Sequence, residues 1–263
     1  AVAKGLGGPH GGAFWDYSQA TENEKTKGFE QFYKRFSLWH KWGYYKGESI
    51  KRVEDMIMHN QPLEVGLGVE YSMGGIVVNE RMETGIDGLL AAGEVTAGTF
   101  GACRIGDGLI EMLAHGMKAG ETAVEYCKHH DRVDSNHSDV DDIVNNILRY
   151  FNNDTGPNAI KFYNKLENIC DAGLGVVRNG KSLQKALEKL LEQKEYVEKL
   201  TLQSTSRYYN FEWLRALQAK NMITCDEAAL RAALERKESR GCHIREDSET
   251  VAHDHYLHHY QFT

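Results

Sequence analysis

The sequence predicts an α+β fold in which a glycine-rich segment of short strands is followed by an all-helical region. Between residues 62 and 101, short apolar runs alternate with glycines, which is typical of strands joined by tight turns. Residues 106–128 then carry apolar side chains at helical spacing. Further along the chain, apolar residues have the spacing of one face of an amphipathic helix: Leu183, Ala186, Leu187, Leu190 and Leu191.

Composition narrows the class of protein. The chain has 263 residues and a net charge of −7, and 41% of its residues are hydrophobic. These values predict a globular protein of one large domain or two ordinary ones. No apolar run approaches the roughly 18 residues needed to cross a bilayer. The charges alternate instead of forming a basic stripe, which argues against nucleic acid as a partner. The 5 widely spaced cysteines favour a reducing compartment, so we expect a cytoplasmic protein.

The first segment, residues 1–60, has the character of a piece of a larger domain. A glycine cluster at residues 5–12 predicts a loop that enters a strand near residues 13–17. His10 lies in this loop, where a turn contact is a more common role than metal ligation. Residues 56–58 (Met-Ile-Met) are candidate core residues.

From about residue 139 to residue 240, the sequence predicts a helical bundle. Thr224, followed three residues later by Glu227, is a capping-box signature that predicts a helix beginning there and running to about Lys237. Gly241 is then expected to end that helix. Further core candidates in this region are Trp213, Leu214 and Leu217.

Three short motifs carry the chemical signal: residues 71–76 (Tyr-Ser-Met-Gly-Gly-Ile), 88–94 (Gly-Leu-Leu-Ala-Ala-Gly-Glu) and 101–110 (Gly-Ala-Cys-Arg-Ile-Gly-Asp-Gly-Leu-Ile). A strand ending at Glu94 would place a carboxylate where α/β folds bind nucleotides, and Glu can accept both ribose hydroxyls. Glycines allow the backbone to approach a flat ring, and a helix N-terminus offers N–H groups to an anion. Taken singly, each feature is also common in loops without a function.

Together, the three motifs resemble the flavoprotein subunit of succinate dehydrogenases and fumarate reductases and, more distantly, aspartate oxidase. The family pattern is His-Tyr-x-Met-Gly-Gly-Ile, then Gly-Leu-(Tyr/Phe)-Ala-(Ala/Val)-Gly-Glu, then Gly-Ala-Asn-Arg-Leu-Gly-x-Asn-Ser-Leu. Residues 175–179 resemble the segment before the family's second bundle helix. Residues 238–247 (Glu-Ser-Arg-Gly-Cys-His-Ile-Arg-Glu-Asp) are similar to a signature near its C-terminus.

The resemblance implies a partial FAD-binding α/β domain with the tail of a capping domain, followed by an all-α helical bundle domain. We expect residues 1–60 to be the capping-domain tail, 61–130 the C-terminal part of the FAD-binding domain, and 131–263 the helical domain and tail. The chain contains no Gly-x-Gly-x-x-Gly, so the family's pyrophosphate-binding turn is expected on an N-terminal half that shares the FAD. That half is either a separate polypeptide of a split subunit, which we favour, or the rest of a longer chain. Alone, the chain is expected to hold FAD weakly or not at all.

The resemblance also implies roles for single residues. Arg104 corresponds to the arginine that clamps a substrate carboxylate through two parallel hydrogen bonds, and Glu70 stands where the family has a substrate-binding His. Glu94 corresponds to the residue that holds the adenosine ribose. The implied cofactor-binding set is Gly74, Gly75, Gly93, Glu94, Gly106, Leu109 and Ile110, with no metal ligand.

Three departures affect the choice of substrate: Glu70 replaces His, Cys103 replaces Asn, and Gly108-Leu109 replaces Asn-Ser. A glutamate beside a substrate carboxylate is a like-charge pair that costs about 4 kcal/mol at 4 Å with an effective dielectric near 20. Three alternatives therefore stay open. Glu70 is protonated, or the substrate presents a neutral or cationic group there, or the substrate is not a dicarboxylate.

Two functional hypotheses follow. In the first, the chain is half of an FAD-dependent oxidoreductase that acts on a small carboxylate and exchanges electrons with an iron–sulfur partner, because its own cysteines are not spaced for a cluster. Membrane association would then come through partner subunits. In the second, it is a non-catalytic docking subunit with a decayed site. A metal site near the C-terminus is a weaker alternative to an amphipathic tail, and it would use His253, His255, His258 and His259.

Overall fold

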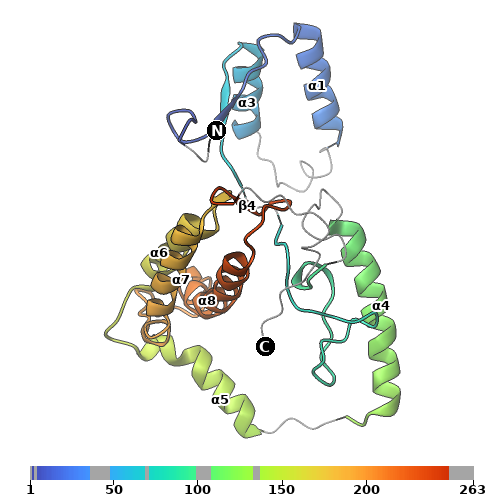
Figure 1. Cartoon of the computed structure of the whole chain (residues 1–263), viewed down its shortest axis with the longest axis vertical. Helices are drawn as coiled ribbons and strands as arrows, with labels where there is room; N and C mark the ends of the chain where they lie inside the picture. The colour runs from blue at the N-terminus through green and yellow to red at the C-terminus, as the bar shows by residue number, and fades with distance from the viewer. Residues whose placement is uncertain are drawn as a thin grey trace. The chain divides into compact units, whose positions relative to one another are not determined.

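The computed structural model describes residue 2 and residues 5–35, 48–68, 71–98, 108–132 and 137–248. The chain divides into two compact units, Ala1–Glu70 and Tyr71–Thr263, which are described separately. Figure 1 shows their elements. No described helix has both the length and the apolar character needed to cross a membrane.

The described part of the first unit contains a two-stranded antiparallel sheet and two α-helices. Strand β1 (Ala13–Trp15) pairs with β2 (Leu63–Val65). Helices α1 (Glu22–Arg35) and α3 (Glu48–Met58) lie between them in the sequence and contact each other. The predicted strand near residues 13–17 is confirmed, whereas the sequence analysis missed both helices.

The glycine loop before β1 encloses a carboxylate. Glu64 accepts hydrogen bonds from the backbone N–H groups of His10 and Gly12, both at 2.9 Å, and its other oxygen lies 2.7 Å from His10 Nδ1. These bonds, led by the one from Gly12, lower the pKa of Glu64. A Cβ at Gly8 would lie 2.6 Å from Glu64 Oε1, so a side chain there would displace the carboxylate from its hydrogen bonds. The prediction that His10 makes a turn contact is confirmed.

The second unit begins with residues 71–98 and helix α4 (Gly108–His129), which confirms the predicted helix over its described part. The apolar runs at 75–78 and 88–92 were expected to be strands, and this expectation is wrong. Within the described ranges they form single bridges, Ile76 with Thr96 and Glu83 with Leu90, because no described segment pairs with either run over several residues. Glu94 therefore lies in a 3₁₀ turn, η2 (Gly93–Val95), and not at a strand end.

The predicted helical bundle is confirmed. It consists of α6 (Ala159–Leu174), α7 (Gly180–Gln193) and α8 (Phe211–Glu235), with the 3₁₀ turns η4 (Arg149–Asn152) and η5 (Val197–Lys199), and helix α5 (His137–Leu148) precedes it and contacts η4. Short strands β3 (Val177–Arg178) and β4 (Ile244–Arg245) pair in parallel. Helices α6, α7 and α8 pack against one another (Figure 1).

The bundle core follows the predicted stripe of α7. Leu183 and Leu190 are fully buried, Ala186 and Leu187 are nearly so, and Leu191 packs against their cluster. Of the candidates on α8, Trp213 and Leu217 also pack against the core. Leu214 is 46% exposed, so its assignment to the core is wrong.

The predicted capping box at Thr224 is also wrong. Helix α8 runs through this position and is capped earlier by Asn210, whose side chain accepts from Trp213 N. Thr224 Oγ1 instead donates to the Lys220 carbonyl at 3.2 Å, as a mid-helix threonine does. Helix α8 ends at Glu235, and Gly241 occupies a later turn with φ +54°.

A capping box does form at α1. Thr21 N donates to Glu24 Oε2 at 2.8 Å, and Glu24 N donates to Thr21 Oγ1 at 3.3 Å. The same four-residue pattern therefore caps a helix at Thr21 and lies inside one at Thr224. What differs is whether the preceding residues continue the helix.

We expect Gly173→Ala to destabilise the bundle. A Cβ at this position in α6 would lie 2.5 Å from Ala186 Cβ of α7 and 3.0 Å from Leu230 Cδ2 of α8, so the helices would have to separate. The expected loss is about 1–3 kcal/mol of unfolding free energy, measured by urea denaturation. Gly120→Ala in α4 is the control, because open space surrounds that position and the change should cost nothing. Equal effects of the two changes would contradict the prediction.

Candidate functional site

The described part of the chain contains six of the predicted site residues. Gly74 and Gly75 belong to one loop, Gly93 and Glu94 to η2, and Leu109 and Ile110 to the first turn of α4. Glu70, Arg104 and Gly106 lie outside the described residues, as do the four histidines of the tail.

Glu94 joins the first two motifs. Its Oε1 accepts a hydrogen bond from Ser72 N at 2.9 Å. The same segments are held together by Ile76 N, which donates to the Val95 carbonyl at 2.9 Å, and by Ala97 N, which donates to the Ile76 carbonyl at 2.9 Å. The Glu94 side chain is exposed, and within the described residues its second oxygen has no partner. One carboxylate oxygen is thus fixed and the other is available to a ligand donor.

The glycines have distinct roles. A Cβ at Gly75 would lie 2.3 Å from the Val95 carbonyl oxygen, so glycine is needed for the two segments to meet. Gly93 has φ +79°, which places Glu94 in the turn. Gly74 has φ +96° and no atom within 4 Å of its missing Cβ, which leaves open space beside the backbone.

Helix α4 supports this loop through two buried polar side chains. Tyr71 Oη donates to Glu111 Oε2 at 3.0 Å, and Gly93 N donates to His115 Nδ1 at 3.3 Å. Because His115 Nδ1 accepts this hydrogen bond, the neutral ring carries its hydrogen on Nε2. Glu111 is 2% exposed and His115 9%. Neither residue was predicted from the sequence, because the buried face of α4 is polar, with Thr122 as its third buried residue, and the large apolar side chains lie on the exposed side.

Two further contacts hold the end of α4. Arg81 pairs with Glu125 at 3.0 Å, and Tyr126 Oη donates to Asp87 Oδ2 at 3.0 Å. The bond to the Asp87 carboxylate raises the pKa of Tyr126. The loop from residue 71 to residue 97 is therefore attached to α4 at four points along the helix.

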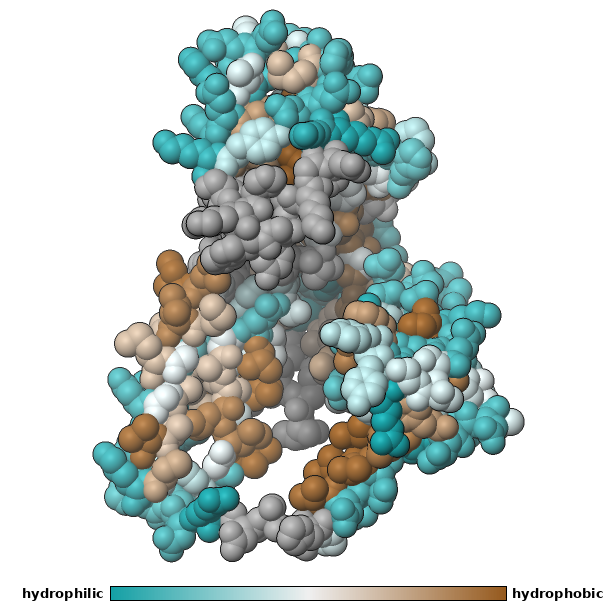
Figure 2. All heavy atoms as spheres, turned by 180° about the vertical axis from the view of Figure 1, so that it is seen from behind, coloured by the Kyte–Doolittle hydropathy of each residue, from teal (hydrophilic) through white to brown (hydrophobic). Residues whose placement is uncertain are grey.

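The predicted flavin-facing residues are strongly exposed. Leu109 is 72% exposed and Ile110 70%, and the same helix exposes Met112, Leu113 and Met117. In Figure 2, which views the molecule from behind, apolar side chains lie over α4 at the left. A contiguous apolar face of this kind marks a surface that contacts a ligand or another polypeptide.

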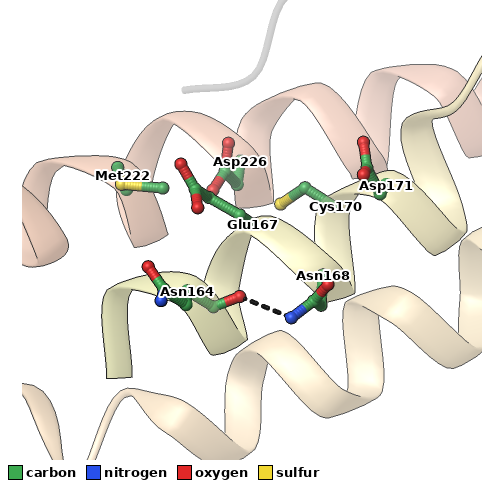
Figure 3. A pocket seen from close by; sticks show the side chains of 7 residues that line it. All are labelled: Asn164, Glu167, Asn168, Cys170, Asp171, Met222 and Asp226. Atoms are coloured by element: carbon green, nitrogen blue, oxygen red, sulfur yellow. Dashed lines mark hydrogen bonds between the residues drawn. The ribbon is translucent and has the colours of Figure 1, made fainter. Parts of the chain in front are cut away.

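A separate hollow of about 570 Å³ lies between α6 and α8 (Figure 3). Its lining includes Cys170, Asp171 and Glu167 of α6 and Asp226 of α8. Burial, together with hydrogen bonding to Asp226, raises the pKa of the Cys170 thiol. Burial also raises the pKa of Asp226. A thiol held in its protonated form is a poor nucleophile, so this hollow does not compete with the Glu94 region as a catalytic site.

Comparisons with known proteins match the same two regions. Residues 45–108 match a family model described as FAD binding domain, and residues 163–263 match one described as Fumarate reductase flavoprotein C-term. The first match contains the loop of Glu94, and the second contains α7, α8 and most of α6. The chain belongs to the family of succinate dehydrogenase and fumarate reductase flavoprotein subunits.

Individual relatives support this family assignment. The chain is 32% identical over 244 residues to an uncharacterized FAD-dependent oxidoreductase of Methanocaldococcus jannaschii, covering 91% of this chain and 41% of that protein. It is 32% identical over 201 residues to the fumarate reductase flavoprotein subunit of Proteus vulgaris, and the match covers 74% of this chain and 33% of that protein. Among solved structures, the Mycobacterium smegmatis Sdh1 complex in the apo form matches with a TM-score of 0.79 and 30% identity, covering 96% and 41%. The chain thus spans well under half the length of these relatives.

The family's C-terminal signature forms a buried charged cluster in the helical domain. Arg245 is 7% exposed and donates to the carbonyls of Ala233 and Arg236 and, through two nitrogens, to Asp247 at 2.7 and 2.9 Å. Asp247 Oδ2 accepts from Gly180 N at 2.6 Å, at the N-terminus of α7. The Arg245 guanidinium holds the pKa of Asp247 well below its usual range. These residues connect the end of α8 to the start of α7.

His243 completes this cluster. Its Nδ1 lies 3.0 Å from Arg178 Nη1, and its Nε2 lies 3.1 Å from the Arg236 carbonyl. Since the guanidinium can only donate and the carbonyl can only accept, the imidazole is neutral with its proton on Nε2. Burial, reinforced by the charge of Arg178, lowers the pKa of His243.

We expect the stability of the helical domain to fall as the pH decreases below about 6.5, the ordinary pKa of histidine. The unfolded chain then takes up a proton that folded His243 resists, so unfolding is favoured by up to about 1.4 kcal/mol per pH unit. Urea denaturation between pH 5 and 8 measures this slope, and His243→Asn should reduce it. The same slope in the variant would contradict the prediction.

Proposed function

We propose that the chain forms the second half of an FAD-dependent oxidoreductase of the succinate dehydrogenase and fumarate reductase type. The observation that carries the proposal is the Glu94 carboxylate, which is exposed, held at one oxygen by Ser72 N, and located in the segment matched by the FAD-binding family. We further propose that residues 1–60 are the tail of a capping domain, 61–130 part of the FAD-binding domain, and 131–263 the helical domain and tail.

The described residues fit FAD. Glu94 offers a free carboxylate oxygen to ribose hydroxyls, open space beside Gly74 permits close approach, and Leu109 and Ile110 present apolar surface to a flat ring. When bound, FAD supplies the hydride acceptor or donor for the reaction. We assign Gly75 and Gly93 to the backbone geometry of this site, and Gly106 to the loop before α4.

We assign substrate binding to Arg104. Its planar guanidinium suits a carboxylate, because two parallel hydrogen bonds fix both the position and the orientation of the substrate. Glu70 would lie beside the same group and disfavour a second carboxylate there. We therefore propose a small carboxylate substrate. Beside Glu70, either the substrate presents a neutral or cationic group, or Glu70 is protonated.

The apolar face of α4 would be covered by the remaining part of the FAD-binding domain, which shares the cofactor. Several relatives are named as subunits of fumarate reductases, and this supports assembly with further subunits. We propose that one of them is an iron–sulfur protein, since the 5 cysteines of this chain are not spaced to ligate a cluster. We place the protein in the cytoplasm, with any membrane attachment provided by partners.

We expect Glu94→Ala to reduce FAD retention by the assembled protein. The ribose hydroxyls would lose a charged acceptor, and bonds of this kind correspond to a loss of affinity of about tenfold or more. Flavin absorbance after gel filtration measures the retained FAD. Glu188→Ala on the exposed face of α7 is the control and should retain FAD normally. Equal FAD content in both variants would argue against the assignment of Glu94.

We expect Arg104→Lys to lower kcat/KM by about a hundredfold in a dye-linked assay of the FAD-containing assembly. Lysine keeps the charge but loses the two-pronged geometry, so the substrate is held less accurately. The flavin spectrum should not change. Unaltered turnover in this variant and in Arg104→Ala would instead support the alternative, a docking subunit whose site has decayed.

The companion variant Glu70→His tests the substrate assignment. Removing a negative charge from beside a carboxylate should raise kcat/KM for succinate or fumarate. If kcat/KM did not increase, a charged Glu70 would not lie beside a substrate carboxylate. Because FAD content is measured separately, failure of this assignment is distinguishable from failure of the cofactor site.

A further inference from the structure

A groove of about 860 Å³ runs between α6 and α7 and adjoins the hollow of Figure 3, with which it shares Asn164 and Asn168. Lys161 and Lys165 of α6 line one wall, and Lys185 and Lys189 of α7 line the other. Each pair is four residues apart, so its two side chains project from the same face of their helix. Two rows of ammonium groups therefore border one depression.

These four lysines are exposed, and none of them pairs with a carboxylate among the described residues. In contrast, Lys118, Lys194 and Lys220 each form an ion pair. The chain as a whole is acidic, with a net charge of −7, but Glu192 is the single acidic residue among those that line the groove. Like charges four residues apart on a helix repel each other, so an anionic partner would relieve a repulsion present in the free protein.

The other lining residues indicate the chemical class of that partner. Exposed Ala172 and the aliphatic stems of the lysines provide apolar surface, and Asn164, Asn168 and Ser182 provide uncharged hydrogen-bonding groups. No aromatic side chain lines the groove to stack a base, and no arginine offers a fork to a phosphate. Isolated ammonium groups on aliphatic stems suit carboxylates that alternate with aliphatic side chains.

We propose that the groove between α6 and α7 is a docking surface for an acidic, amphipathic polypeptide segment of a partner protein. The segment lies along the two helices, its carboxylates pair with the four lysines, and its aliphatic side chains contact Ala172 and the aliphatic stems of those lysines. The surface consists of the bundle helices alone, so the proposal does not depend on the assignment of the flavin site.

Fluorescence anisotropy with the full 263-residue chain tests the proposal. The probe is a fluorescein-labelled peptide that repeats Glu-Ala-Leu-Glu, and it is compared with the same peptide carrying Gln for Glu. We expect the Glu peptide to bind, to weaken as salt rises, and to lose at least about tenfold in affinity for a variant with Lys161→Gln, Lys165→Gln, Lys185→Gln and Lys189→Gln.

The matched control removes the same charge from scattered, exposed positions outside the groove and carries Lys27→Gln, Lys128→Gln, Lys199→Gln and Lys237→Gln. It should bind the peptide as the parent chain does, and circular dichroism should show both variants to be folded. Equal losses of peptide affinity in the two variants would mean that binding depends on net charge alone, and this would overturn the proposal. Absence of binding would overturn it too, as would tighter, groove-dependent binding of a labelled oligothymidylate.

Discussion

The arrangement of the candidate site depends on the polar anchoring of α4. Glu111 and His115 are buried in the face of the helix that meets the preceding loop, and each is bonded to one point of that loop, Tyr71 and Gly93. A buried carboxylate or imidazole without a partner carries a large desolvation penalty, so the loop and the helix are stable only in this register. Glu94 is held in its turn as a consequence, although it makes no bond to α4 itself.

The two parts of the second unit differ in how complete their packing is. Helices α6, α7 and α8 share one core, and the contact at Gly173 brings them close enough to bury Leu183, Leu190 and Leu230 fully. Helix α4, by contrast, is attached by polar groups on one side and exposes Leu109, Ile110 and Leu113 on another. The helical domain is therefore self-sufficient in hydrophobic burial, whereas the flavin-binding part needs further apolar surface to cover it. This difference agrees with a chain that spans about 40% of its relatives.

Local sequence patterns predict some elements of this structure and not others. The stripe of α7 and the helix of residues 108–129 were predictable, because a helix with one apolar face satisfies its own backbone and needs only a surface to bury that face. The runs at 75–78 and 88–92 were not, since strands require partners and these runs meet one residue each. The capping pattern likewise occurs at Thr21 and Thr224 with opposite outcomes. Glu111 and His115 were missed because apolar periodicity gives no weight to buried polar side chains.

The sequence by itself determined the family, the helical bundle and the presence of a carboxylate and an arginine in glycine-rich motifs, because these depend on residue identity and spacing. Only the tertiary structure decided that Glu94 lies in a 3₁₀ turn held by Ser72, that α4 anchors the loop at four points, and that four lysines from two helices border one groove. Those features arise between residues far apart in the chain. Hydrogen-bond partners and facing helix walls are set by packing, which periodicity along one segment does not encode.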